Sequence, residues 1–396
     1  MTASWGNAFT PARLGPLTLR NRIIKAATFE GRTRRGEVTP ELVDFHRHVA
    51  RGGAAMSTVA YCAVAPDGRV FRDCLVLDED SVPGLRRLTD AVHAEGAAVS
   101  AQLGHAGLVA DAVSNKQRSL APSRRFSAPG RSLVPAATPA DLARVREDFV
   151  RAARCAVEAG FDCVEVHVGH NYLLSSFLSP NLNKRKDTYG GSLENRARFP
   201  REVLSAVREE VGSRVAVTAK LNMADGVKRG LWLTESLDVA KWIEADGSVD
   251  ALQLTGGSSL LNGMYFFRGD VPIDDFARTQ PAALRPLVRP FLRRIMPTYP
   301  FEEAFFLPFA RQFRAALELP LILLGGINRL DTIESAIDEG FTFVAMARAL
   351  LREPDLPNRL ATQAAAEGLC IHCNKCAPTI YGRTGTHCVL VPDRNT

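Results

Sequence analysis

Short apolar, β-branched runs alternate with longer helical patterns along almost the whole chain, and this alternation constrains the fold more than any other feature. The runs lie at 23–27, 56–62, 97–103, 163–167, 215–221, 251–254, 321–324 and 343–346. Helical patterns lie at 40–51, 83–95, 139–159, 194–211, 234–245, 303–317, 331–339 and 355–366. Strands separated by helices form parallel βαβ units, and eight such units close into a barrel. The sequence therefore predicts an α/β fold, a (β/α)8 TIM barrel, rather than an open doubly wound sheet.

Two segments are longer than the connections of a plain barrel. Residues 106–137 follow the third predicted strand, and residues 258–302 follow the sixth. Because loops of this length are usually functional, we expect 258–302 to be an insertion that caps the barrel mouth. Contact of this segment with a membrane surface or another subunit is the alternative. We place the barrel at 1–368 and a cysteine-rich C-terminal extension at 369–396.

The charge and hydropathy patterns exclude several classes of protein. The formal net charge is +6, but arginines are spread along the chain and no basic run is interleaved with aromatics, so we expect no nucleic-acid partner. No stretch approaches the roughly 20 apolar residues of a membrane span. Without a signal-like start or a disulfide-like cysteine pattern, we expect a cytoplasmic protein that acts on a small molecule. Whether it forms a homo-oligomer is left open.

Polar residues follow the fourth predicted strand, at the end of the barrel where TIM-barrel active sites lie. His167 and His170 stand three residues apart there, and Tyr172 follows. Two imidazoles so placed can converge on one substrate oxygen, and a phenol, with a reference pKa near 10, can deliver a proton. The alternatives are histidines that only satisfy loop carbonyls, or a zinc site, for which H-x-x-H by itself is a weak signal.

This stretch also carries a family resemblance. H-x-x-H-x-Y at 167–172 is followed by F-L-S-P-x-x-N-x-R-x-D-x-Y-G-G-S at 177–192, and Q-L-G-H-A-G stands at 102–107. The pattern resembles the signature of the Old Yellow Enzyme family of flavin oxidoreductases, which includes ene-reductases and dienoyl-CoA reductases. The resemblance covers nearly the whole chain.

The resemblance implies that FMN lies across the barrel mouth and that NAD(P)H reduces it. The residues implied in cofactor binding are Ala26, Ala27 and Thr28 along the ring, Gln102 and His167, Lys220 near N1 and O2, and Gly325, Gly326, Ala347 and Arg348 at the phosphate. The implied reaction reduces an activated C=C bond of an enone or dienone. Hydride comes from flavin N5, His167 and His170 hold the substrate oxygen, and Tyr172 supplies the proton.

The C-terminal cysteines form a second motif, Cys370-x2-Cys373-x2-Cys376-x11-Cys388. This spacing is compatible with a [4Fe–4S] cluster, with zinc, or with thiols that hold no metal. In the family, similar runs bind [4Fe–4S] in the branch of dienoyl-CoA reductases and trimethylamine dehydrogenase. An alternative function is therefore an FMN/[4Fe–4S] dehydrogenase or dienoyl reductase that passes electrons through the cluster. A flavin-free lyase or isomerase that uses His167 and His170 as acid and base is a third reading.

Overall fold

The centre of the molecule is a closed barrel of parallel strands, seen in a computed structural model that describes residues 7–363, 366–382 and 384–391. The strands follow one another around the barrel in the order β10-β11-β12-β3-β4-β5-β8-β9. Their bounds are β3 Ile23–Lys25, β4 Met56–Ala63, β5 Ala98–Gly104, β8 Cys163–Val168, β9 Ala216–Asn222, β10 Ala251–Thr255, β11 Leu321–Leu324 and β12 Phe343–Met346. The predicted (β/α)8 barrel is confirmed.

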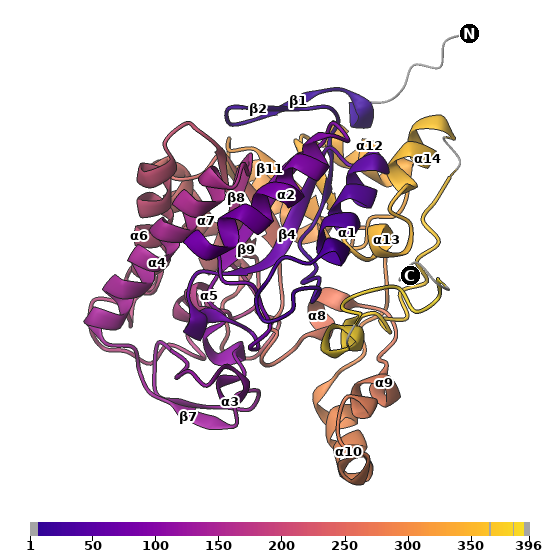
Figure 1. Ribbon diagram of the computed structural model, residues 1–396. Helices are drawn as coiled ribbons and strands as arrows, with labels where there is room; N and C mark the ends of the chain where they lie inside the picture. The colour runs from indigo at the N-terminus through magenta and orange to yellow at the C-terminus, as the bar shows by residue number, and fades with distance from the viewer. Residues whose placement is uncertain (1–6, 364–365, 383, 392–396) are drawn as a thin grey trace.

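Helices surround the barrel on its outer side (Figure 1). The main ones are α1 Pro40–Arg51, α2 Val82–His93, α4 Pro139–Glu158, α6 Leu193–Val211, α7 Leu233–Asp246, α11 Leu307–Ala316, α12 Leu330–Asp338 and α14 Leu356–Thr362. Thr39 and Thr138 cap α1 and α4 through their side chains, as N-terminal Thr-Pro pairs predict. Helix α11 begins later than predicted because Ala304 has a φ of +52°, which a right-handed helix excludes. The Glu303 side chain accepts hydrogen bonds from the backbone of Asn328 and Arg329, at 2.7 and 3.2 Å.

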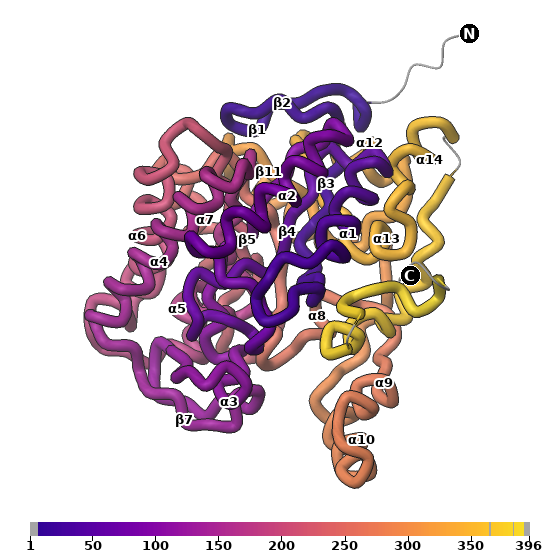
Figure 2. The backbone as a smooth tube through the Cα atoms, in the orientation of Figure 1, coloured from indigo at the N-terminus to yellow at the C-terminus, as the bar shows by residue number. Residues whose placement is uncertain are grey.

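The two ends of the barrel carry different structures (Figure 2). The hairpin of β1 (Ala12–Leu14) and β2 (Leu17–Leu19) lies at one end. At the other end, after the carboxyl ends of the strands, lie α5 (Leu173–Leu178), α13 (Arg348–Arg352) and the two long segments. Residues 106–137 form η4 (Gly107–Val109), α3 (Ala112–Asn115), β6 (Arg125–Ser127) and β7 (Ser132–Val134). The site therefore has a wall built from loops at this end.

The segment 258–302, called the cap segment below, is mostly helical. It contains α8 (Met264–Phe267), α9 (Ile273–Arg278), η5 (Ala282–Leu284) and α10 (Arg285–Ile295), and α10 projects away from the barrel (Figure 1). The remaining short helices are η1 (Asn7–Phe9), η2 (Pro66–Gly68), η3 (Glu79–Ser81) and η6 (Ala377–Tyr381), the last in the tail. Among the residues described, no helix is both long and apolar enough to cross a membrane. The role of a cap and the boundary at residue 368 remain predictions.

Candidate active site

A cavity of about 510 Å³ opens at the carboxyl ends of the barrel strands. The structure brings all twelve residues predicted around a flavin and its substrate to the wall of this cavity: Ala26, Ala27, Thr28, Gln102, His167, His170, Tyr172, Lys220, Gly325, Gly326, Ala347 and Arg348. The cap segment contributes Phe266, Leu292 and Ile295, and the tail contributes His372 and Cys376. A cavity of this size suits a cofactor or a drug-sized ligand.

The turn after β8 gathers the two histidines and the tyrosine. His170 and Asn171 adopt φ values of +58° and +57°, so the chain turns back sharply after the strand. The His167 ring centroid lies 5.1 Å from that of His170 and 4.6 Å from that of Tyr172. The predicted convergence of these three side chains is therefore a local consequence of the turn.

Partners from the two following strands fix the position of His170. Its backbone N–H donates to Asn222 Oδ1 at 3.0 Å, and its Nε2 is hydrogen-bonded to Thr255 Oγ1 at 2.9 Å. Asn222 in turn donates to Asp225 Oδ1 at 3.0 Å and to the Gly257 carbonyl at 2.8 Å. The contribution of Thr255 was not visible in the sequence, because it depends on the neighbouring strand.

Burial sets the protonation states of these groups. Burial, together with the nearby Lys220 cation, lowers the pKa of His170 to about 3, and burial lowers the pKa of His167 well below its usual value. Burial raises the pKa of the Tyr172 phenol above its usual value of 10. At neutral pH the site therefore presents two neutral imidazoles and a protonated phenol. His167 Nδ1 is buried and has no hydrogen-bond partner within the described part of the chain.

A charged layer lies directly beneath the histidines. Glu165 precedes His167 by two residues, so both side chains point into the barrel. Its carboxylate accepts hydrogen bonds from Gln102 Nε2 and Gln253 Nε2, each at 2.6 Å, and lies 3.2 Å from Lys220 Nζ. Lys220 is only 2% exposed, so this carboxylate compensates for a buried ammonium group. The i, i+2 spacing from His167 was the signal in the sequence that could have found Glu165.

A second buried cation, Lys25, supports the loop predicted to lie along the ring. Lys25 is fully buried, and its Nζ donates to the Ala26 carbonyl at 2.6 Å and to Thr28 Oγ1 at 2.9 Å. Glu30 lies 3.9 Å away and also accepts the Ala60 N–H at 2.7 Å. Burial lowers the pKa of Lys25 to about 8. Sequence analysis did not single out this residue because strand β3 reads as uniformly buried.

The part of the cavity wall that follows β11 and β12 combines a glycine pair with an arginine. Gly325 and Gly326 have φ values of +116° and +76°, which bulkier residues rarely adopt. A Cβ atom on Gly325 would lie 2.6 Å from Phe306 Cδ2, so both space and conformation require glycine here. Arg348 Nη1 donates to the Arg268 carbonyl at 3.0 Å and to Asn374 Oδ1.

Several features of this site fit FMN. The lysine ammonium and the unpartnered His167 nitrogen lie on β9 and β8, the glycine pair and Arg348 follow β11 and β12, and all of them line one cavity. A buried cation suits a reduced flavin ring, which carries negative charge, and an arginine beside exposed backbone suits a phosphate.

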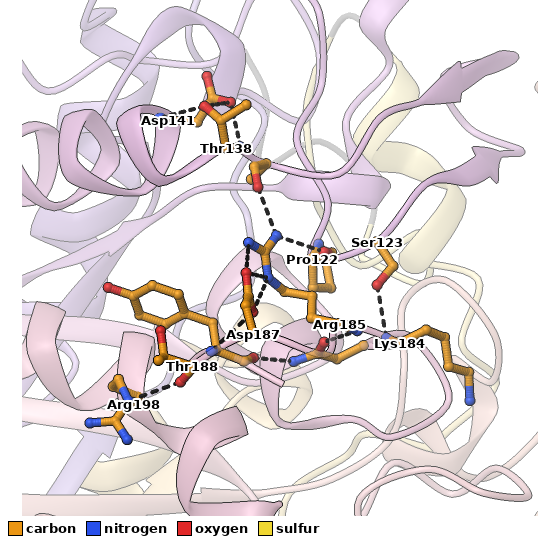
Figure 3. Close-up of polar contacts among 12 residues, drawn as sticks. Pro122, Ser123, Thr138, Asp141, Lys184, Arg185, Asp187, Thr188 and Arg198 are labelled. Carbon is orange, nitrogen blue, oxygen red and sulfur yellow. Dashed lines mark hydrogen bonds and ion pairs between the residues drawn. The ribbon is translucent and has the colours of Figure 1, made fainter. Parts of the chain in front are cut away.

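The long motif after Tyr172 has mainly a structural role (Figure 3). Arg185, whose side chain is 9% exposed, pairs with Asp187 at 2.5 Å and donates to the carbonyls of Pro122 and Ala137 at 3.1 and 2.7 Å. The Lys184 N–H donates to Ser123 Oγ at 2.8 Å, as the same view shows. These contacts join the loop after β8 to the 106–137 segment and so fix the wall of the site.

The four C-terminal cysteines are free and partly buried. Burial raises the pKa of Cys376 to about 12, and Cys370, Cys373 and Cys388 are close enough to influence it electrostatically. However, within residues 7–363, 366–382 and 384–391, no three His, Cys, Asp or Glu side chains are grouped so as to hold a metal ion. The predicted metal site at these cysteines is therefore not confirmed by the geometry and stays a prediction.

Comparison with known proteins agrees with the site. Residues 7–255, more than half of the chain, match the NADH:flavin oxidoreductase / NADH oxidase family. The chain belongs to this family. It is an FMN-dependent NAD(P)H oxidoreductase of the Old Yellow Enzyme type, which confirms the resemblance and sets aside the flavin-free lyase or isomerase.

Individual relatives show which parts of the chain are shared. A 4,4'-dithiodibutanoate disulfide reductase of Rhodococcus erythropolis is 66% identical over 98% of this chain and 96% of that protein. A metal reductase of Desulforamulus reducens is 34% identical over 96% of this chain but only 53% of its own length. Among solved structures, morphinone reductase has a TM-score of 0.70 at 25% identity, covering 95% of this chain and 94% of that one. A 2-naphthoyl-CoA reductase complex has a TM-score of 0.84 at 25% identity, covering 98% and 57%.

Proposed function

We propose that this flavoenzyme reduces small organic disulfides with NAD(P)H. The observation that carries the proposal is the 66% identity, over nearly the full length of both chains, to a protein named as a disulfide reductase. The balanced reaction consumes one NAD(P)H, one proton and one R–S–S–R and gives NAD(P)⁺ and two thiols. A cytoplasmic location, where thiols stay reduced, suits this reaction and is part of the proposal.

The residues of the cavity have distinct roles in this proposal. Ala26, Ala27, Thr28 and Gln102 would contact the ring of FMN, Lys220 its pyrimidine side, and Gly325, Gly326, Ala347 and Arg348 its phosphate; all of these residues line the cavity. Bound FMN supplies a hydride once NAD(P)H has reduced it. His167 and His170, both neutral, donate hydrogen bonds toward the substrate atom on which negative charge develops. For a disulfide, that atom is the sulfur that leaves as thiolate.

A second candidate substrate class is an activated alkene, as the sequence predicts. The observation that favours it is the protonated phenol of Tyr172 beside His167, because reduction of C=C needs a proton at carbon and reduction of S–S does not. Morphinone reductase, whose structure is similar to this one over 94% of its own chain, supports a reductase of this kind. In this second reaction His167 and His170 would hold a carbonyl oxygen, and Tyr172 would be the acid.

The tail carries a further proposal, a [4Fe–4S] cluster or zinc on Cys370, Cys373, Cys376 and Cys388. Four partly buried, free thiols that influence one another support it. Iron and acid-labile sulfide would be assayed in anaerobically purified protein. About four irons per chain, as one cubane requires, would favour the electron-transferring alternative, whereas zinc alone or no metal would exclude the cluster.

The central experiment offers the holoenzyme both substrate classes under anaerobic conditions. We expect oxidation of NADH or NADPH to release two thiols for each nicotinamide consumed with 4,4'-dithiodibutanoate, counted by mass spectrometry. His170→Ala, which removes the imidazole donor, should lower kcat/KM by about tenfold, the loss of one hydrogen bond to a developing charge. His48→Ala, at an exposed position outside the cavity, is the matched control. An enzyme that retains FMN and reduces enones but forms no thiol from any disulfide would refute the proposal.

A further inference from the structure

The loop 370–376, called the cysteine loop below, packs between the cap segment and the loops after β11 and β12. Two of its residues, His372 and Asn374, have positive φ values of +57° and +56°. Residues other than glycine are held in this conformation only when their surroundings demand it. The contacts of the two side chains hold this part of the backbone in place.

Asn374 uses its whole side chain to join three segments. It is 2% exposed. Its Nδ2 donates to the carbonyls of Arg268 and Asp270, each at 2.9 Å, at the base of the cap segment. Its Oδ1 accepts a hydrogen bond from Arg348 Nη1. The same Arg348 nitrogen also donates to the Arg268 carbonyl, so Arg268, Asn374 and Arg348 form one closed group.

His372 provides a second link on the same side. Its ring stacks on Phe301 with centroids 3.3 Å apart and planes 8° apart. Its Nε2 lies 3.0 Å from Asn328 Nδ2, in the loop after β11, and its carbonyl accepts the Asp270 N–H at 3.1 Å. The cysteine loop therefore contacts the segment after β11, which holds the glycine pair, and the segment after β12, which holds Arg348. It also contacts the base of the cap segment.

We propose that Asn374 is a positioning residue for cofactor binding: it holds the Arg348 guanidinium in the direction that meets the FMN phosphate. This inference rests on the proposed phosphate site. The physical reason is that an arginine with several rotatable bonds loses less freedom on binding when its direction is already fixed. Through Asn374, the fold of the cysteine loop affects how tightly FMN binds. This effect does not depend on whether the four cysteines bind a cluster, zinc or no metal.

The test compares FMN with riboflavin, which has the same ring but no phosphate. In Asn374→Gly the backbone keeps its positive φ without strain, while all three side-chain hydrogen bonds are lost. We expect the FMN dissociation constant to rise about tenfold, as for one lost charge-assisted hydrogen bond, and the riboflavin constant to stay unchanged. Release of flavin from diluted holoenzyme, or from enzyme exchanged with riboflavin, is followed by the rise in free-flavin fluorescence.

Two further variants make the outcomes distinct. Asn183→Ala is the matched control, because Asn183 is also buried and also donates to two carbonyls, but its Oδ1 accepts the backbone N–H of Arg185 instead of an arginine side chain, and it lies outside the cavity wall. It should lower thermal stability and leave FMN affinity unchanged. Arg348→Gln should weaken FMN at least as much as Asn374→Gly, and the double variant should add little further loss.

Each result is informative. If Arg348→Gln binds FMN as tightly as the wild type, the phosphate site itself is wrong and the inference falls with it. If Arg348→Gln weakens FMN but Asn374→Gly does not, only the role of Asn374 is overturned. Equal weakening of FMN and riboflavin by Asn374→Gly would also overturn it, since general damage to the site has no phosphate dependence. Should the glycine variant not fold, Asn374→Ser is used with the same expectations.

Discussion

The Tyr172 hydroxyl separates the two candidate reactions, because only one of them needs its proton. Burial raises the pKa of this phenol, so it is fully protonated at neutral pH and every molecule carries the acid. Its ring lies 4.6 Å from that of His167, at the place where the substrate is expected to bind. We predict that Tyr172→Phe strongly slows the reduction of enones and barely changes the reduction of disulfides.

The sizes of the two effects follow from the chemistry. General acid catalysis contributes about 10²- to 10⁴-fold, or about 3–5 kcal/mol of barrier. The nearby Tyr61 hydroxyl, which also lines the cavity, already donates to the Gly68 carbonyl at 2.9 Å, so it is a poor substitute for Tyr172. Cleavage of S–S releases a thiolate whose conjugate acid has a pKa near 8.5, which needs stabilisation but no proton at carbon. There the phenol contributes at most one hydrogen bond, about 1 kcal/mol, or roughly fivefold.

The assay measures kcat/KM for 2-cyclohexenone and for 4,4'-dithiodibutanoate on the same holoenzyme preparations. Flavin reduction by NAD(P)H, followed separately by stopped flow, should be unchanged. Tyr189→Phe is the control, because the Tyr189 hydroxyl bonds Glu202 at 3.2 Å and does not line the cavity. Equal losses for both substrates would refute the reasoning, since the phenol would then act in binding or in site structure. An undiminished rate with the enone would show that Tyr172 is not the acid.

Three further predictions concern the charges of the site. Because the pKa of His170 is lowered to about 3, kcat/KM should show no acidic limb from about pH 5 to 8, and an inflection near 6.5 that disappears in His170→Asn would contradict this. The unfolded chain binds more protons than the folded one between the lowered pKa and 6.5, so stability should fall as pH decreases through that window. The unfolding free energy should change by at most about 1.4 kcal/mol per pH unit for each imidazole, and by less for His170, which is partly exposed. Urea unfolding at several pH values measures this slope. Lys220→Met should lower the midpoint potential of the bound flavin, by about 30 mV for each 1.4 kcal/mol of lost stabilisation of the reduced anion; a potential unchanged in spectroelectrochemical titration would place Lys220 away from the ring.

Local sequence signals predicted the barrel and the meeting of His167, His170 and Tyr172, whereas the cofactor-binding part of the cavity wall was predicted from the family resemblance. Strand bounds follow from short β-branched runs, and His167, His170 and Tyr172 meet because the four residues between β8 and α5 form one turn. Residues that act through distant partners gave no such signal. Asn374 touches Arg268 and Arg348, which are 106 and 26 residues away, and no local pattern encodes those contacts.

The cap segment raises the question of what selects between S–S and C=C substrates. Both are electrophiles that accept a hydride, and both develop negative charge on an atom that neutral His167 and His170 can stabilise. The match to the general family ends at residue 255, directly before the cap segment, whereas the disulfide reductase of Rhodococcus erythropolis is similar over 98% of the chain. Leu292 and Ile295 of α10 line the cavity, so this helix lies within reach of a bound substrate. We therefore propose that the cap segment selects the substrate, whereas the barrel residues carry out the reduction.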